Sequence, residues 1–193
     1  MRHTVLALFV IVTACGGGID SDQAAEAAYV GLDGAVRKAL TLGFDGFNAA
    51  SSANIPPQMT TGDVMGTLTV SGQVDMGASV NKGMRLLLDL SDYQDIVPSD
   101  TDLDIVYDTD AAAQPHLDLS LRGIPDAALS GTLTGTFLMT GEIEGDVTLD
   151  LSISGMTEAD PADATRIRRV VGTTTISGTA TSGYGTYSVD ITL

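Results

Sequence analysis

The chain has 193 residues, a formal net charge of −16 and one cysteine. A chain of this length supports one compact domain with a hydrophobic core and leaves little material for a second. The negative charge repels phosphate backbones, so the composition excludes nucleic acid as a partner. One cysteine cannot form an internal disulfide, and no Cys/His spacing typical of structural zinc occurs.

The N-terminal segment has the pattern of an export signal. A short basic start, Met1 to His3, precedes an apolar run, Val5 to Val12, that is too short to cross a bilayer as a helix. The run ends in Val12-Thr13-Ala14-Cys15, and this four-residue motif resembles the lipobox of bacterial lipoproteins. The resemblance implies a signal peptide over residues 1–14, a diacylglycerol thioether on Cys15 and acylation of the new amine.

Lipidation of Cys15 would place the protein in the cell envelope with the membrane as a partner. Two or more acyl chains hold a protein firmly on a membrane, whereas one chain binds reversibly. Gly16, rather than Asp, follows the cysteine, and by analogy with lipoprotein sorting this favours the outer membrane. The motif does not indicate whether the protein would face the periplasm or the cell surface. The alternative is an ordinary cleaved signal ending near Ala14, which leaves an unpaired thiol in an oxidising compartment.

A helical period follows a short tether over residues 15–19. Residues 20–48 are expected to form one helix, because apolar side chains recur at spacings of three and four and so share one face. Interior glycines weaken a helix by about 1 kcal/mol each relative to alanine, so this helix is expected to depend on packing. The apolar residues are Ala25, Tyr29, Leu32, Val36, Leu40, Phe44 and Phe47, and the glycines are Gly31, Gly34, Gly43 and Gly46.

Residues 49–61 are expected to be a linker, and residues 62–193 an antiparallel β domain. Pro56-Pro57 fits neither a helix nor a central strand. Beyond Gly62 the hydrophobic period changes to two, which is typical of strands with one buried face. The predicted strands cover residues 68–80, 84–90, 103–107, 117–121, 133–153 folded as a hairpin around 144–146, 170–180 and 187–193.

This pattern predicts a mainly β fold, either a curved antiparallel meander or an open barrel of about seven to nine strands, with the N-terminal helix packed against it. A weak repeat begins and ends with glycine at 66–72, 135–141 and 172–178. Its irregular spacing argues against a solenoid or a propeller. We interpret these glycines as points on the apolar face where a strand bends or where another element, such as the helix, comes close.

No set of residues typical of catalysis is evident, and the sequence predicts no enzyme and no catalytic residues. His116 is the one histidine after the signal, and no Gly-x-Ser-x-Gly occurs. Because Cys15 is assigned to the lipid, the sequence offers no convincing Ser-His-Asp or Cys-His set. Glu142 and Glu144 lie two residues apart, as a glycosidase pair can. The chain has no Trp for sugar stacking, so we interpret these two residues as a solvated hairpin tip.

The segment 86–121 contains many aspartates and no lysine or arginine. Asp100, Asp102 and Asp104 have the spacing that opens an EF-hand loop, but Ile105 replaces the required glycine and no Glu closes the loop. Asp102 and Asp104 are instead expected to share a strand face, where these three aspartates could hold one loosely bound Ca²⁺. The preferred interpretation is a solvated acidic surface that prevents edge pairing, with no cofactor.

Arg166, Arg168 and Arg169 form the basic cluster of the sequence. We expect the cluster to neutralise nearby carboxylates, and recognition of a polyanion such as a lipid headgroup is the alternative.

Three functions stay open, and the preferred one is a non-enzymatic, monomeric, lipid-anchored envelope lipoprotein. Such a protein would be structural, bind an envelope protein, or shelter an apolar ligand between sheet and helix. The second function is a calcium-assisted surface adhesin or partner-binding module that uses the acidic segment. The third function is a small outer-membrane β-barrel. The alternation over residues 187–193 resembles the last strand of such barrels, although Leu193 is not aromatic.

Overall fold

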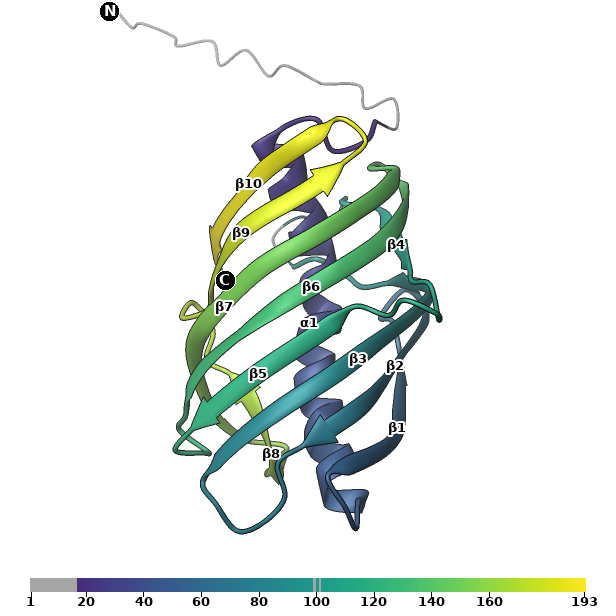
Figure 1. Ribbon diagram of the computed structural model, residues 1–193. Coiled ribbons are helices and arrows are strands. Elements are labelled where there is room, and N and C mark those ends of the chain that lie inside the picture. The colour runs from purple at the N-terminus through teal and green to yellow at the C-terminus, as the bar shows by residue number, and fades with distance from the viewer. Residues whose placement is uncertain (1–16, 99, 101) are drawn as a thin grey trace, which may run out of the picture.

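Figure 1 shows the computed structural model, which describes residues 17–98, 100 and 102–193. One helix, α1 (Asp22–Ala49), precedes ten strands, all paired antiparallel in one sheet, within this described part of the chain. The predicted fold class is therefore confirmed, with ten strands in place of seven to nine. The strands are β1 (Asn54–Thr61), β2 (Met65–Val74), β3 (Asn81–Gln94), β4 (Ile105–Asp108), β5 (His116–Arg122), β6 (Ala128–Gly141), β7 (Gly145–Asp160), β8 (Asp163–Arg169), β9 (Thr175–Ser182) and β10 (Gly185–Thr192).

The strand order is β1-β2-β3-β4-β6-β7-β9-β10, and β5 also lies between β3 and β6. The N-terminal part of β3 pairs with β5, whereas Tyr93, near its other end, pairs with Tyr107 on β4. β8 pairs only with the end of β7. The sheet curves around α1, which runs along its inner side and contacts β1, β2, β3, β4, β8 and β10 (Figure 1).

The helix begins at a side-chain cap and buries the face that the sequence predicts. The Ser21 hydroxyl oxygen accepts a hydrogen bond from the backbone N–H of Ala24 (3.2 Å), and Asp22 lies in the first turn, where it complements the helix dipole. Leu32 and Leu40 on the apolar face are 0% and 2% exposed. Of the residues described, no helical segment combines the length and the apolar character that crossing a bilayer requires.

The inward side chains of the strands and the apolar face of α1 form one core. Along β7, Val147, Leu149, Leu151 and Ile153 are buried and alternate with exposed residues, as a strand with one solvated face requires. These side chains belong to the same hydrophobic cluster as the helix residues. The space between sheet and helix, which the sequence left open as one possible place for an apolar ligand, contains these packed side chains.

Residues 54–61 form the edge strand β1, so the predicted linker is wrong over this part. β1 pairs with β2, and the register shifts between Ile55 and Gln58. Pro56 and Pro57 lie at this shift. Proline has no backbone N–H to donate, and an edge strand tolerates this because it has a neighbouring strand on one side only. Proline excluded a central strand here, but it did not exclude an edge strand.

Other boundaries also differ from the predictions, and the strand predicted over residues 170–180 begins only at Thr175. Residues 75–80, predicted to continue a strand, connect β2 to β3, which begins at Asn81. β8 was not predicted, because its sequence carries three arginines and one buried apolar residue, Ile167, and therefore shows no clear alternation.

The repeat glycines that lie in strands are on the apolar face, but their close neighbours belong to the sheet side and not to the helix. Gly172 lies instead in the turn before β9, where a Cβ would meet nothing within 4 Å. Gly72 has φ +117° and pairs with the buried Leu86 on β3, and a Cβ there would meet the backbone carbonyl of Arg85. Gly178 has φ +149°, and a Cβ there would meet the carbonyl of Asp150 on β7. Close approach of neighbouring strands in a tightly curved sheet therefore explains these glycines.

The glycines of α1 lie where the helix backbone comes close to side chains from the sheet side. A Cβ on Gly34 would meet the Asp95 carboxylate, and a Cβ on Gly31 would meet the Tyr107 hydroxyl, which donates a hydrogen bond to the Ala28 carbonyl (2.6 Å). The glycines that lower the helix propensity of α1 therefore allow it to pack closely, and the sequence predicted that this helix would depend on packing.

Gly34→Ala is expected to destabilise the protein by about 1–3 kcal/mol, because the added methyl displaces a buried carboxylate. Helix propensity alone predicts stabilisation of about 1 kcal/mol. Urea unfolding measures the difference, and Gly43→Ala is the matched control. At Gly43 the nearest atom is Sδ of the flexible Met84 side chain, 3.0 Å from the new Cβ, so the control should be neutral or stabilising. An equal effect of both substitutions would contradict the role of the contact with Asp95.

Candidate functional site

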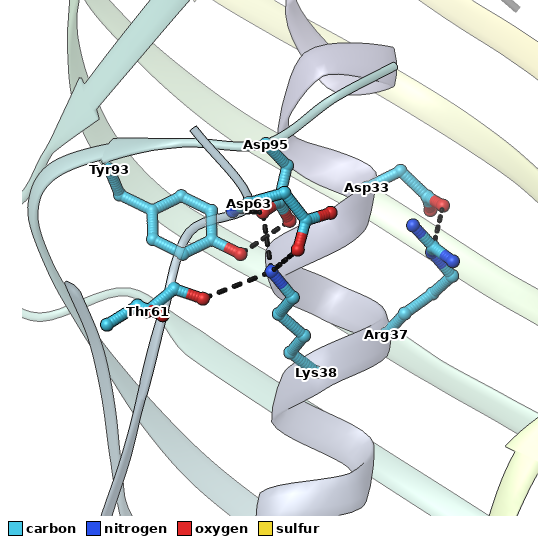
Figure 2. A network of polar contacts seen from close by, with 7 residues as sticks. All are labelled: Asp33, Arg37, Lys38, Thr61, Asp63, Tyr93 and Asp95. Atoms are coloured by element: carbon cyan, nitrogen blue, oxygen red, sulfur yellow. Dashed lines mark hydrogen bonds and ion pairs between the residues drawn. The ribbon is translucent and has the colours of Figure 1, made fainter. Parts of the chain in front are cut away.

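A polar network joins the middle of α1 to the ends of β1 and β3 (Figure 2). The Lys38 ammonium donates hydrogen bonds to Asp95 Oδ1 (2.5 Å), Asp63 Oδ1 (2.9 Å) and the Thr61 carbonyl oxygen (3.1 Å). An ammonium has three N–H groups, so each one has an acceptor here. The Asp95 side chain is 1% exposed, so Lys38 neutralises a buried charge.

The remaining contacts of Asp95 also come from donors. Its Oδ2 accepts a hydrogen bond from the Tyr93 hydroxyl (2.5 Å), and its Oδ1 accepts one from the backbone N–H of Asp63 (2.8 Å). Burial, followed by the hydrogen bond to Asp95, raises the pKa of the Tyr93 phenol, so the hydroxyl stays protonated and continues to donate. The network fixes the Asp95 carboxylate as a structural anion.

A second ionic group lies one turn earlier on α1, centred on Asp33. Asp33 Oδ2 accepts a hydrogen bond from Arg169 Nη2 (2.5 Å) and lies 3.4 Å from Arg37 Nε, while Oδ1 accepts from the Tyr29 hydroxyl (3.1 Å). Burial, followed by the Asp33 charge, raises the pKa of Tyr29, which therefore remains a donor. Arg169 ends β8, so its pair with Asp33 ties that strand to the helix.

Both ionic groups contribute to the wall of a cleft of about 440 Å³. The cleft is bounded by α1, by the segment after β3 and by the segment after β8, and most of its lining is apolar. Two of its apolar side chains, Ile96 and Val171, are 51% and 94% exposed. The lining residues are Val30, Gly31, Asp33, Gly34, Arg37, Asp95, Ile96, Val97, Pro98, Arg169, Val170, Val171, Thr174 and Leu193.

An apolar cleft with a few polar groups is the usual form of a small-molecule binding site. No histidine or cysteine is among the residues that line it, so it holds no pairing of nucleophile and imidazole base. Within the described chain, Arg169 Nε, Arg169 Nη1 and Thr174 Oγ1 are buried and have no hydrogen-bond partner. The arrangement therefore suits binding.

The proposed calcium ligands do not form a cluster. Asp100, Asp102 and Asp104 are exposed, and β4 begins only at Ile105, so the expected shared strand face is wrong. Asp104 Oδ1 accepts a hydrogen bond from Gln94 Nε2 (2.9 Å) instead. No group of three or more His, Cys, Asp or Glu side chains that could hold a metal occurs among the described residues, which omit 99 and 101 in this loop.

The prediction for the arginine cluster is confirmed, because each member pairs with a carboxylate on another element. Arg166 Nε lies 2.7 Å from Asp45 Oδ1 on α1, and Arg168 Nη2 lies 2.7 Å from Glu158 Oε1 on β7. The third member is Arg169, described above. Two of the three pairs therefore attach β8 to the helix.

The other residues considered from sequence are solvated or lie outside the described part. His116 is exposed at the start of β5, and Glu142 and Glu144 are exposed in the hairpin between β6 and β7, as interpreted. Cys15 lies outside the described residues.

The sequence did not identify Lys38, Asp95 or Thr174. Asp95 is one of many aspartates in an acidic segment, and nothing local distinguishes the one that becomes buried. The scarcity of lysine, with only Lys38 and Lys82 in the chain, was the one usable signal.

The fold and cleft define a class of protein: a strongly curved, open antiparallel sheet around an N-terminal helix, with an apolar cleft beside the helix. In the described residues β1 and β10 end the strand order and do not pair with each other. No protein-family model, curated protein or solved structure matches the chain.

Proposed function

We propose that this protein is a non-enzymatic lipoprotein of the bacterial cell envelope, anchored through lipid on Cys15, that shelters an apolar ligand in the cleft beside α1. The observation that carries the anchoring is the motif Val12-Thr13-Ala14-Cys15 directly after an apolar run. The outer membrane is the favoured location, because Gly16 follows the cysteine.

Contacts of the first described residues support an anchor at one end of the sheet. The Gly17 carbonyl accepts a hydrogen bond from the backbone N–H of Glu144 (3.2 Å), and Gly17 forms a β-bridge with Ile143 in the β6–β7 hairpin. Gly17 follows Cys15 by two positions, and two positions of extended chain span at most about 7 Å. A lipid on Cys15 would therefore hold the end of the sheet with this hairpin near the membrane.

The apolar lining of the cleft supports the ligand-binding part of the proposal. Exposed apolar side chains that gather at a cavity typically mark a binding site, and Ile96 and Val171 lie at this one. Both cleft walls are fixed to α1, one through Asp95 and Lys38 and the other through Arg169 and Asp33.

Cys15→Ser is expected to abolish incorporation of labelled fatty acid and to leave the signal uncleaved, because serine has no thiol to form the thioether. Metabolic labelling with an alkyne-tagged fatty acid and the mass of the product measure this. Thr13→Ser keeps a small polar residue at its position and is the control that should still be labelled. Undiminished labelling of Cys15→Ser would overturn the lipoprotein assignment.

A further inference from the structure

We infer that the ligand of the cleft is an amphiphile with a single carboxylate headgroup, such as a long-chain fatty acid, and that Arg169 and Thr174 bind this headgroup. The inference rests on the proposed function of the cleft as a site for an apolar ligand, and it names the chemical class of that ligand.

Arg169 offers donors that the described chain does not use. Its side chain is 7% exposed, and its Nη2 is paired with Asp33. Nε and Nη1 have no partner among the described residues, although a guanidinium carries five N–H groups and buried donors are normally satisfied. Arg169 lines the cleft, so an anion in the cleft would supply an acceptor for one of these N–H groups.

Thr174 supplies a second unused group. It is 1% exposed, lines the same cleft, and its Oγ1 has no partner within the part of the chain that is described. Its backbone N–H and C=O are both hydrogen-bonded to Leu193, at 3.1 and 2.8 Å, so its position is fixed. A threonine hydroxyl can rotate to donate to a carboxylate oxygen.

The charges around the cleft favour an anion over a cation. The two carboxylates of the lining, Asp33 and Asp95, are each paired with cationic side chains and with a tyrosine hydroxyl. A cationic ligand would have to compete with Lys38 or Arg169 for them. The unpaired N–H groups of Arg169, in contrast, need an acceptor.

A single negative charge fits better than a double one. Asp33 and Asp95 both line the cleft, and a phosphate monoester with about two charges would be repelled more strongly than a carboxylate.

The remaining lining accommodates an alkyl chain. Ile96, Val97, Val170 and Val171 are apolar, and the volume of about 440 Å³ is within the usual range for small-molecule sites.

The test uses the full chain in phosphatidylcholine vesicles and two photoreactive probes of equal length, palmitic acid and hexadecanol, each bearing a diazirine. At alkaline pH the acid is ionised and the alcohol is neutral. Mass spectrometry of cross-linked peptides reports labelling of the 95–98 and 169–174 segments relative to peptides elsewhere, which corrects for partitioning into the vesicles.

The acid is expected to label the cleft about tenfold more than the alcohol, as hydrogen bonds to a charged group imply. Arg169→Gln should lower labelling by the acid to the level of the alcohol and leave the alcohol unchanged. Thr174→Val should reduce the preference for the acid about threefold, because one neutral hydrogen bond is lost. Arg168→Gln is the matched control, since Arg168 pairs with Glu158 outside the cleft, and it should change neither signal.

Equal labelling of the cleft by acid and alcohol in the wild type would overturn the carboxylate inference but leave the apolar ligand in place. Absence of cleft labelling by both probes would overturn the proposed ligand-binding function as well. If Arg169→Gln loses its β circular dichroism, Thr174→Val decides, because it removes an oxygen that makes no hydrogen bond in the described structure. An unchanged preference for the acid in Thr174→Val would then overturn the inference.

Discussion

Leu40→Asp is expected to abolish folding. Leu40 is 2% exposed on the face of α1 that packs into the sheet, and it belongs to the same core cluster as the inward residues of the strands. A charged carboxylate in this apolar surrounding has no partner, and its burial costs several kcal/mol, comparable with the total stability of a domain of about 5–15 kcal/mol. We expect loss of the β circular dichroism signal and aggregation measured by light scattering.

Two controls separate burial from other effects of the substitution. Leu40→Met conserves volume and apolar character and should cost less than about 1.5 kcal/mol. Asn48→Asp introduces the same charge at an exposed position in the last turn of the same helix, where the helix dipole opposes it, and should cost less than about 1 kcal/mol. An unfolding midpoint for Leu40→Asp equal to that of the wild type would mean that α1 does not contribute to the core of the domain.

Lys38→Met is expected to destabilise the protein by about 3–5 kcal/mol, because it removes the cationic partner of a buried carboxylate. Asp95 is 1% exposed and would keep only the Tyr93 hydroxyl and the Asp63 N–H as donors. Urea unfolding at neutral pH measures the loss.

The neighbouring residue provides a matched control. Arg37 pairs with Asp33 at 3.4 Å, but its side chain is half exposed, so Arg37→Met should cost less than about 1 kcal/mol (Figure 2). The double variant Lys38→Met/Asp95→Asn should regain most of the loss, because no unpaired charge stays buried. Equal losses for Lys38→Met and Arg37→Met would contradict the buried network.

The same contacts that stabilise α1 also shape the cleft. Lys38 holds the segment after β3 through Asp95, and Asp33 holds the end of β8 through Arg169. We therefore expect substitutions in either group to alter ligand binding as well as stability, whereas Arg168→Gln should alter neither.

The sequence by itself determined the features that depend on neighbours along the chain. The motif at Val12 to Cys15 that resembles a lipobox is a local pattern. The apolar face that includes Leu32 and Leu40 and the alternation along β7 are local patterns with periods of 3.6 and two residues. The expectation that Arg166, Arg168 and Arg169 neutralise carboxylates also followed from composition, because cations are rare in a chain with a net charge of −16.

Only the tertiary structure decided which residues meet across the fold. Asp33 and Arg169 are separated by 136 positions and Lys38 and Asp95 by 57. Strand order places Asp95 against Gly34 and leaves most other aspartates in solvent, although all of them look alike in sequence. The edge strand β1 and the cleft likewise depend on neighbours that are distant in the chain. A periodic pattern in a short segment carries no information about such neighbours. The physical reason is that burial, which distinguishes one carboxylate from another, is a property of the packed molecule and not of the segment that carries the residue.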